Sequence, residues 1–205
     1  MDQRQQDLEQ WLNETCKLPS YKLHSMAGDA SFRRYFRVEL GNASYVAMDA
    51  PPPRENCVPY IAIAKALRQL GLCAPDIIAS DVNKGFLLVT DFGDYLYLKE
   101  LNQNNVEDLY SRALDALAIL RTCRQVDGWP ISTFTAEFMR QELELFKEWF
   151  LHKHLNLTLS PHIDRQLATC FDFLAQTSGA QTQVFMHRDY HSANLMVFPY
   201  FIHRI

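Results

Sequence analysis

The alternation of hydrophobic and polar positions changes character twice along the chain. Residues 21–90 consist mainly of short stretches rich in β-branched and aromatic residues, bounded by turn-forming residues, which is typical of strands. A segment with apolar residues at three-residue steps, over about 55–70, predicts a helix among them. The predicted strands are 21–26, 35–40, 43–49, 76–80 and 85–90. Hairpin-type connections between these strands favour an antiparallel sheet.

From residue 104 onward the apolar residues recur at helical spacing. Helices are expected over 106–120, from 136 onward and over 161–179. The last of these has a serine N-cap and a proline in its first turn, and a glycine ends it. The pattern therefore predicts an α+β protein with a small strand-rich lobe over residues 1–100 and a helical lobe over 101–205.

The composition narrows the class of protein. The chain has 205 residues, of which 48% are hydrophobic and 21% charged, and this excludes a disordered protein. A net charge of −4 without a basic block argues against nucleic-acid binding. No apolar run approaches the ~18 residues that span a bilayer, and the polar first residues do not resemble a signal peptide. Five scattered cysteines predict reduced thiols, so we expect a cytoplasmic protein with no membrane partner.

One polar loop carries the residue types of a phosphoryl-transfer site. His187, Asp189 and Asn194 have the H-x-D-x-x-x-x-N spacing and lie between two apolar stretches, 184–186 and 195–197, that are predicted to be short strands. In such a loop the aspartate orients the acceptor hydroxyl and accepts its proton, while the asparagine presents an amide oxygen to Mg²⁺. Asp189 is therefore the predicted catalytic base and Asn194 the predicted metal ligand. The alternative is a polar loop whose His and Asp merely cap one another.

With His191 and Ser192 after the aspartate, the loop resembles the aminoglycoside phosphotransferase and choline kinase group of small-molecule kinases. The stretches 29–37, 46–52 and 185–196 are similar to bacterial N-acetylmuramate/N-acetylglucosamine anomeric kinases of cell-wall recycling. This resemblance implies a protein-kinase-like two-lobe fold whose small lobe binds the nucleotide. It also implies ATP and Mg²⁺ as cofactors, and the C1 hydroxyl of an amino sugar as the acceptor.

The expected phosphate contacts depart from the general kinase scheme. Gly28 is the single glycine of the turn between the first two strands, and with Ser31 it is expected to bring backbone N–H groups to the phosphates, although both residues also suit an ordinary turn. The third strand lacks the lysine that usually holds the phosphates, so Arg33 or Arg34 is the candidate for the missing charge. The alternative for this pair is a solvated strand face. Glu55 could pair with a phosphate-binding cation, although glutamate is also favoured at a helix N-terminus.

A second motif has the letters of a magnesium-binding element, but its position in the chain predicts a different role. Asp91-Phe92-Gly93 has the letters of the magnesium-binding D-F-G element, but in kinases that element follows the catalytic loop, whereas here it precedes Asp189. Because it comes directly after the last predicted strand of the small lobe, Thr90, Asp91, Phe92 and Gly93 are predicted to form the hinge that hydrogen-bonds adenine. A plain turn at the end of the strand is the alternative.

The residues after the catalytic loop lead to a further expectation. The resemblance stops near Val197, and residues 195–205 contain no acidic side chain, whereas the family chemistry requires a second magnesium carboxylate there and more helices around the acceptor. A frameshift or premature stop is the simplest explanation, and the 205-residue chain is expected to be inactive. Two alternatives are a catalytically dead fragment that at most binds nucleotide or a partner, and a live kinase of another small alcohol, such as choline or an aminoglycoside. The sequence does not indicate the oligomeric state.

Overall fold

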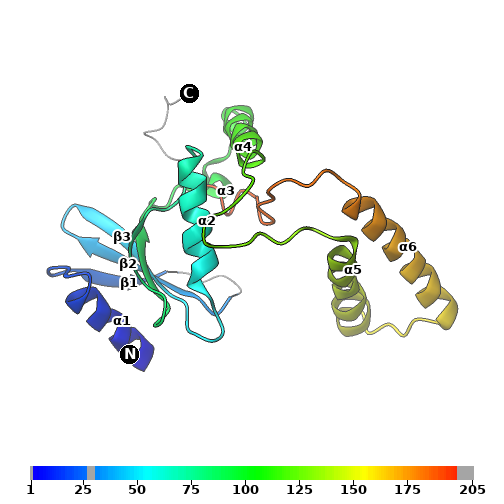
Figure 1. Ribbon diagram of the computed structural model, residues 1–205, viewed down its shortest axis with the longest axis horizontal. Coiled ribbons are helices and arrows are strands. Elements are labelled where there is room, and N and C mark those ends of the chain that lie inside the picture. Colours follow the sequence, from blue (N-terminus) through cyan, green and yellow to red (C-terminus); the bar gives the residue numbers. More distant parts are fainter. Residues whose placement is uncertain (1, 27–30, 198–205) are drawn as a thin grey trace. The chain divides into compact units, whose positions relative to one another are not determined.

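A five-stranded antiparallel sheet forms from the strand-rich part of the chain. The computed structural model describes residues 2–26 and 31–197. The strands are β1 (Lys22–Ser25), β2 (Arg34–Leu40), β3 (Ala43–Asp49), β4 (Ile77–Asp81) and β5 (Phe86–Thr90). Their order in the sheet is β1-β2-β3-β5-β4, with every neighbouring pair antiparallel (Figure 1). The predicted α+β class and antiparallel sheet are confirmed, and each strand lies within one residue of its expected bounds.

Helices make up most of the remaining regular structure. They are α1 (Gln3–Glu14), α2 (Cys57–Gln69), α3 (Tyr97–Glu100), α4 (Val106–Leu120), α5 (Ala136–Leu145), the π-helix η1 (Phe146–His154) and α6 (Pro161–Gly179). The pattern predicted α2, α4, α5 and α6, whereas α1, α3 and the π-helical form of η1 were not expected. Ser160 caps α6 through a hydrogen bond from the Ile163 N–H at 3.3 Å, as its sequence predicts. Among the helices of the described residues, none has both the length and the apolarity to cross a membrane.

The chain divides into two compact units that differ from the predicted lobes. One unit consists of Met1–Pro130 with Phe185–Ile205, and the other of Ile131–Val184. The first unit contains the sheet together with the predicted catalytic loop, and the second is the hairpin of α5, η1 and α6. The predicted lobes follow from the change from strand patterns to helix patterns and not from compactness, so their boundary near residue 100 stays a prediction.

Two predicted short strands beside the catalytic loop are absent from the described structure. Residues 184–186 have no regular secondary structure, because the side chain of Phe185 packs on the apolar cluster around Ala62 and Cys123 instead of joining a ladder. Of residues 195–197, Met196 forms a single isolated antiparallel bridge with Leu96. The expectation of strands was wrong here, since a short apolar stretch buries its side chains equally well without strand pairing.

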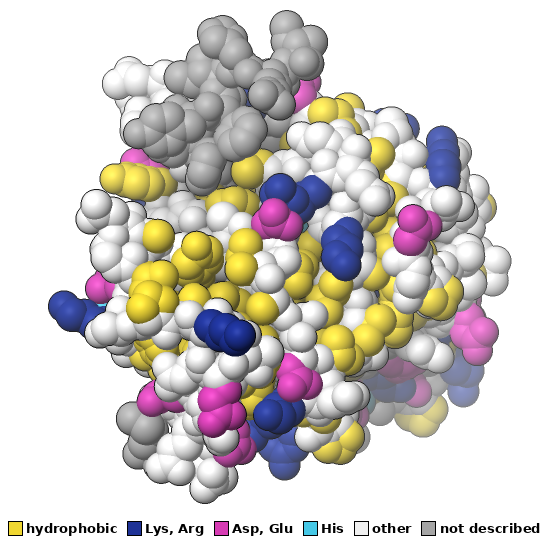
Figure 2. All heavy atoms as spheres, turned by 60° about the vertical axis from the view of Figure 1, so that its left-hand side comes forward, with side chains coloured by type: hydrophobic (Ala, Val, Ile, Leu, Met, Phe, Trp, Pro, Cys, Tyr) yellow, Lys and Arg dark blue, Asp and Glu magenta, His cyan; other side chains and the backbone are white. Residues whose placement is uncertain are grey.

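The two faces of the sheet carry different cores, one under α1 and one under α2 (Figure 1). The α1-side core comprises Leu8, Trp11, Leu12, Phe36, Val38, Ala47, Phe86 and Leu88. The α2-side core comprises Met48, Ala50, Cys57, Leu87 and Val89. Because successive side chains of a strand point to opposite faces, Asp49 faces α1 and Met48 faces α2. On the face in Figure 2, basic and acidic side chains lie interspersed among hydrophobic ones.

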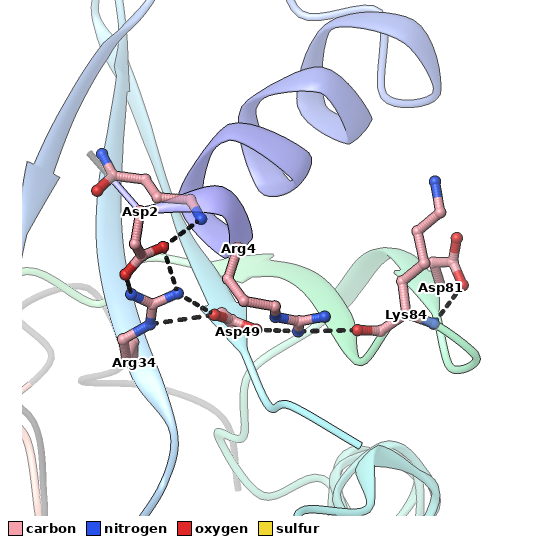
Figure 3. A network of polar contacts seen from close by, with 7 residues as sticks. Asp2, Arg4, Arg34, Asp49, Asp81 and Lys84 are labelled. Carbon is pink, nitrogen blue, oxygen red and sulfur yellow. Dashed lines mark hydrogen bonds and ion pairs between the residues drawn. The ribbon is translucent and has the colours of Figure 1, made fainter. Parts of the chain in front are cut away.

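A buried carboxylate fastens α1 to the sheet (Figure 3). Asp49 is fully buried and accepts hydrogen bonds from Arg34, from Nε at 3.1 Å and from a terminal nitrogen at 2.6 Å, and one from Arg4 of α1. Arg4 also donates to the Lys84 carbonyl at 2.9 Å, and Arg34 pairs with Asp2, the N-cap of α1. A buried carboxylate needs such partners, since an unpaired one costs several kcal/mol. The network therefore fixes α1 on its face of the sheet.

Replacing this carboxylate should destabilise the protein. We expect Asp49→Ala to lower the free energy of unfolding by about 3 kcal/mol, because the two arginines lose their shared buried partner. Asp108→Ala is the matched control, since Asp108 forms an exposed pair with Arg112 and should cost less than about 1 kcal/mol. Urea unfolding followed by tryptophan fluorescence measures both. Equal losses in the two variants would contradict the role assigned to Asp49.

Candidate active site

The side chains of the predicted catalytic loop converge. The Asn194 Nδ2 group donates to Asp189 Oδ2 at 2.6 Å and to the Asp189 carbonyl at 3.1 Å. His191 Nε2 lies 3.1 Å from the other carboxylate oxygen, Oδ1. The Asp189 side chain is 70% exposed, so it remains open to a substrate. The amide nitrogen of Asn194 is turned to Asp189, so its Oδ1 atom is the one that could ligate a hard cation.

A tyrosine that the sequence analysis did not single out anchors this loop. The Tyr190 hydroxyl donates to the Ala113 carbonyl of α4 at 2.7 Å, and its ring packs on the core formed by α3 and α4. The ring of His187 lies edge-on to Tyr190, with centroids 5.3 Å apart, and His187 Nδ1 accepts a 3.4 Å hydrogen bond from the Asp189 N–H. Burial raises the pKa of Tyr190, so its hydroxyl keeps the proton that it donates. The contacts of Tyr190 and His187 therefore fix the loop to the core under α4, while the Asp189 side chain is exposed.

The chain after the predicted hinge pairs with the chain around the end of the catalytic loop. Three backbone hydrogen bonds join them: the Tyr97 N–H to the Leu195 carbonyl at 2.8 Å, the Leu98 N–H to the Ser192 carbonyl at 3.0 Å, and the Val197 N–H to the Tyr95 carbonyl at 2.7 Å. These bonds lie within the first compact unit. The hinge at 90–93 and the loop at 187–194 are therefore connected by ordered backbone rather than by a free linker.

The predicted hinge is a turn built around a buried aspartate. The Asp91 side chain is 3% exposed; its Oδ2 accepts from Arg37 Nε at 2.7 Å, and its Oδ1 accepts from the Gly93 N–H at 2.8 Å. Burial alone would raise the pKa of Asp91, but the hydrogen bonds from Arg37 and Gly93 outweigh it and hold the pKa below its usual range. Asp91 is thus an ionised structural group committed to Arg37. It is not the carboxylate beside Asn194, so the structure gives no support to the D-F-G assignment.

Both ends of the hinge are already hydrogen-bonded within the chain. The Thr90 N–H donates to the Asp76 carbonyl at 3.1 Å, and the Thr90 hydroxyl accepts from the Asp76 N–H at 3.1 Å. Gly93 adopts φ of +83°, a left-handed conformation that favours glycine, and its N–H is used by Asp91. Phe92, between them, is half-buried. Thr90 and Gly93 therefore shape the turn, and the adenine contact predicted for residues 90–93 stays a prediction.

On the phosphate side, the structure brings one arginine to the start of α2. Arg33 Nε donates to Glu55 Oε2 at 2.9 Å, and Glu55 Oε1 accepts from the Phe32 N–H at 3.1 Å. Ser31 accepts a 3.1 Å hydrogen bond from the Arg33 N–H through its hydroxyl. Gly28 lies outside the described residues. Glu55 therefore pairs with a cation, as the sequence suggested, and that cation is Arg33.

The two candidate arginines lie at the start of β2 and contact different partners. Arg34, the first residue of β2, points to the α1 face, where it is bound to Asp49. Arg33, just before β2, reaches Glu55, which precedes the N-cap of α2, and Met48 lies on that same α2 side with 1% of its surface exposed. On the α2 face of β3, where a lysine usually holds the phosphates, this chain thus has the uncharged Met48. The cation on that face is Arg33. The geometry favours Arg33 over Arg34 as the phosphate-side charge.

The donor set of the loop suits a hard cation that is shared with a nucleotide. Within residues 2–26 and 31–197, no group of three or more His, Cys, Asp or Glu side chains is arranged to hold a metal ion. Asn194 nevertheless supplies an amide oxygen, whereas Asp189 is the predicted base. Mg²⁺ commonly takes one or two protein oxygens, with phosphate oxygens and waters completing its shell. The loop therefore fits Mg²⁺ bound together with ATP, and it does not make a site from protein ligands alone.

Comparison with known proteins places the chain in a family. It matches the phosphotransferase enzyme family over residues 22–199, a range that contains the sheet, the predicted hinge and the predicted catalytic loop. The chain belongs to this family. It is 36% identical to the N-acetylmuramate/N-acetylglucosamine kinase of Pseudomonas aeruginosa over 206 residues, and 38% identical to that of Pseudomonas putida over 208 residues. The matches cover 96% and 95% of this chain, but the chain spans 60% of the length of each relative.

Comparison with a solved structure confirms the fold. The solved structure is a thermostable mutant of aminoglycoside phosphotransferase APH(4)-Ia in a ternary complex with AMP-PNP and hygromycin B. The TM-score is 0.59, the sequence identity 12%, and the likeness covers 92% of this chain and 66% of the other. At this identity the likeness concerns the fold alone. The kinase-like α+β fold that the resemblance implied is therefore confirmed.

Proposed function

We propose that this protein is the nucleotide-binding and catalytic-loop portion of an ATP-dependent kinase that phosphorylates the anomeric hydroxyl of N-acetylmuramate or N-acetylglucosamine. The observation that carries the proposal is the contact between Asp189 and Asn194, in a loop whose end pairs with the chain leaving the hinge. The names of the Pseudomonas relatives support the acceptor. Such an activity belongs to cell-wall recycling, and its need for ATP favours the cytoplasm.

Each residue of the site has a distinct role in this proposal. Asp189 orients the sugar hydroxyl and accepts its proton as the bond to phosphorus forms. Asn194 holds the carboxylate of Asp189 through Nδ2, and its Oδ1 would ligate Mg²⁺. When bound, Mg²⁺ neutralises negative charge on the transferring phosphoryl group. Arg33, held by Glu55, supplies the positive charge beside the phosphates.

The remaining contacts are with the nucleotide. The backbone of Thr90, Asp91, Phe92 and Gly93 is proposed to receive adenine. The turn that contains Gly28 and Ser31 is proposed to bring N–H groups to the phosphates.

A second candidate function is nucleotide binding without turnover. It is favoured, for the 205-residue chain, by the fact that the chain spans 60% of the length of the Pseudomonas relatives. A kinase of another small alcohol is a weaker candidate, because the relatives at 36% and 38% identity carry the name of an amino-sugar kinase.

The proposal is tested with a fusion protein, in which this chain is followed by the part of the Pseudomonas putida relative that lies C-terminal to the matched region. We expect ADP release that depends on N-acetylmuramate or N-acetylglucosamine. Choline and hygromycin B serve as competing acceptors. ADP release that requires choline or hygromycin B, and that does not occur with the amino sugars, would contradict the proposed acceptor.

Replacing Arg33 should raise the KM for ATP and leave the KM for the sugar nearly unchanged. In the fusion protein we expect Arg33→Met to raise KM for ATP about tenfold or more, since a hydrogen bond to a charged group contributes about 1.5–3 kcal/mol. KM for the sugar should stay within about twofold, because this loss does not reach the acceptor. Arg112→Met, which breaks an exposed pair with Asp108, is the control. An unchanged KM for ATP in Arg33→Met would mean that Arg33 only covers a strand face.

A further inference from the structure

Arg37 of β2 makes hydrogen bonds to three residues of the turn that follows β5. Its Nε donates to Asp91 Oδ2 at 2.7 Å, and a terminal nitrogen donates to Asp91 Oδ1 at 3.2 Å. The same nitrogen lies 3.2 Å from the Gly93 carbonyl. Both terminal nitrogens reach the carboxylate of Asp94 at 2.9 Å. The planar guanidinium thus holds two carboxylates and one carbonyl in a single fixed geometry.

This contact spans the sheet, and its Asp91 part is buried, whereas the Asp94 side chain is 72% exposed. Arg37 belongs to β2, and β3 lies between β2 and β5, so the side chain reaches across a whole strand to the hinge. Arg37 is 20% exposed and its partner Asp91 is 3% exposed. Asp91 also accepts hydrogen bonds from the Gly93 N–H and from Ser44, but the guanidinium is its charged partner, and burial makes the loss of a charged partner costly. The Gly93 N–H in turn depends on Asp91.

We propose that Arg37 is a positioning residue that holds the hinge at 90–93 in the conformation that receives adenine. The inference rests on the proposed function, since it takes these residues as the adenine site. Arg37 acts through Asp91 and through the backbone of Gly93, and does not itself touch the base. Fixing a binding segment in its bound shape strengthens binding because less order has to be gained on association.

The position of Arg37 also links the two ends of the nucleotide site. The chain that enters β2 carries Arg33, which is held by Glu55 on the phosphate side. Four residues later, Arg37 is held by Asp91 on the adenine side. One strand therefore sets the distance between the phosphate-side cation and the hinge. Loosening Arg37 should weaken the base-dependent part of binding and leave the phosphate-dependent part unchanged.

The experiment measures binding of ADP, GDP and inorganic tripolyphosphate to the 205-residue chain by calorimetry. For Arg37→Lys we expect the Kd for ADP to rise about tenfold, because lysine cannot reproduce the bidentate contact with Asp91. The Kd for tripolyphosphate should not change, and the preference for ADP over GDP should shrink. The matched control is Arg140→Lys in the other compact unit, since Arg140 also holds two carboxylates, those of Asp172 and Glu144. It should alter none of the three values.

The other outcomes separate this inference from the proposed function. If Arg37→Lys loses thermal stability but keeps the wild-type Kd for ADP and preference over GDP, Arg37 is structural only and the inference is overturned. A parallel loss of ADP and tripolyphosphate binding would overturn it as well, because the effect would not be specific to the base. If the wild-type chain binds tripolyphosphate and ADP with equal strength, the adenine hinge itself is wrong, and the proposed function loses that element together with this inference.

Discussion

Asp189→Asn in the fusion protein is expected to lower kcat for sugar phosphorylation by about three orders of magnitude. An amide cannot accept the proton of the acceptor hydroxyl, and this proton transfer is the role assigned to Asp189. The substitution also replaces the carboxylate that accepts from Asn194 and lies beside His191. KM for ATP should change little, since the proposed contacts of the nucleotide lie elsewhere. Coupled measurement of ADP release at saturating sugar gives the comparison.

The control for this substitution is Asp115→Asn. Asp115 is exposed on α4, away from the catalytic loop in sequence, and the same change of charge there should leave kcat unaltered. An Asp189→Asn protein that keeps kcat within about tenfold would contradict the assignment, because loss of a general base costs at least about a hundredfold. His191 would then be the next candidate for the base.

The 205-residue chain by itself should show no ADP release that depends on N-acetylmuramate or N-acetylglucosamine. Among the described residues, the proposed ligand of the cation is the neutral amide of Asn194, and Asp189 is assigned to the acceptor hydroxyl. A neutral amide binds a hard cation weakly, and charge stabilisation of a phosphoryl group by a well-held metal is worth several kcal/mol. We therefore expect turnover at background for this chain and clear turnover for the fusion protein under the same conditions.

A measurement of nucleotide binding shows whether a lack of turnover comes from weak binding of the metal ion or from misfolding of the protein. The 205-residue chain should still bind ADP, because the sheet, the hinge and Arg33 belong to its first compact unit. Robust turnover by this chain would contradict the account and require another carboxylate at the metal. Asp49 is not that group, since it faces α1, is fully buried and is held by Arg4 and Arg34.

The sheet was largely predictable because its signals are local. The dipeptide Gly41-Asn42 between two β-rich stretches predicts a tight hairpin, and β2 and β3 are paired across it, with Leu40 opposite Ala43. Helix α1 was missed because most of its residues are polar. Its signal was the spacing of Leu8, Trp11 and Leu12, three apolar residues on one face that become buried under the sheet.

Within the candidate site, contacts that depend on short spacing were predictable. Asp189 and Asn194 are five residues apart, and their motif implied that the two side chains converge, as they do in the structure. The pair of Arg37 and Asp91 is 54 residues apart and crosses a strand, so no local pattern indicates it. The choice between Arg33 and Arg34 also needed the structure, since it depends on which face of the sheet each side chain takes.

The proposed reaction is transfer of the γ-phosphoryl group of ATP to the anomeric hydroxyl of an amino sugar. Phosphorus-31 NMR of the reaction of the fusion protein with ATP, Mg²⁺ and N-acetylmuramate identifies the atom that is phosphorylated. We expect a new sugar phosphate resonance coupled to the anomeric proton, formed in step with ADP and absent in Asp189→Asn. A phosphate on any other sugar carbon, or ADP accompanied by inorganic phosphate alone, would contradict it.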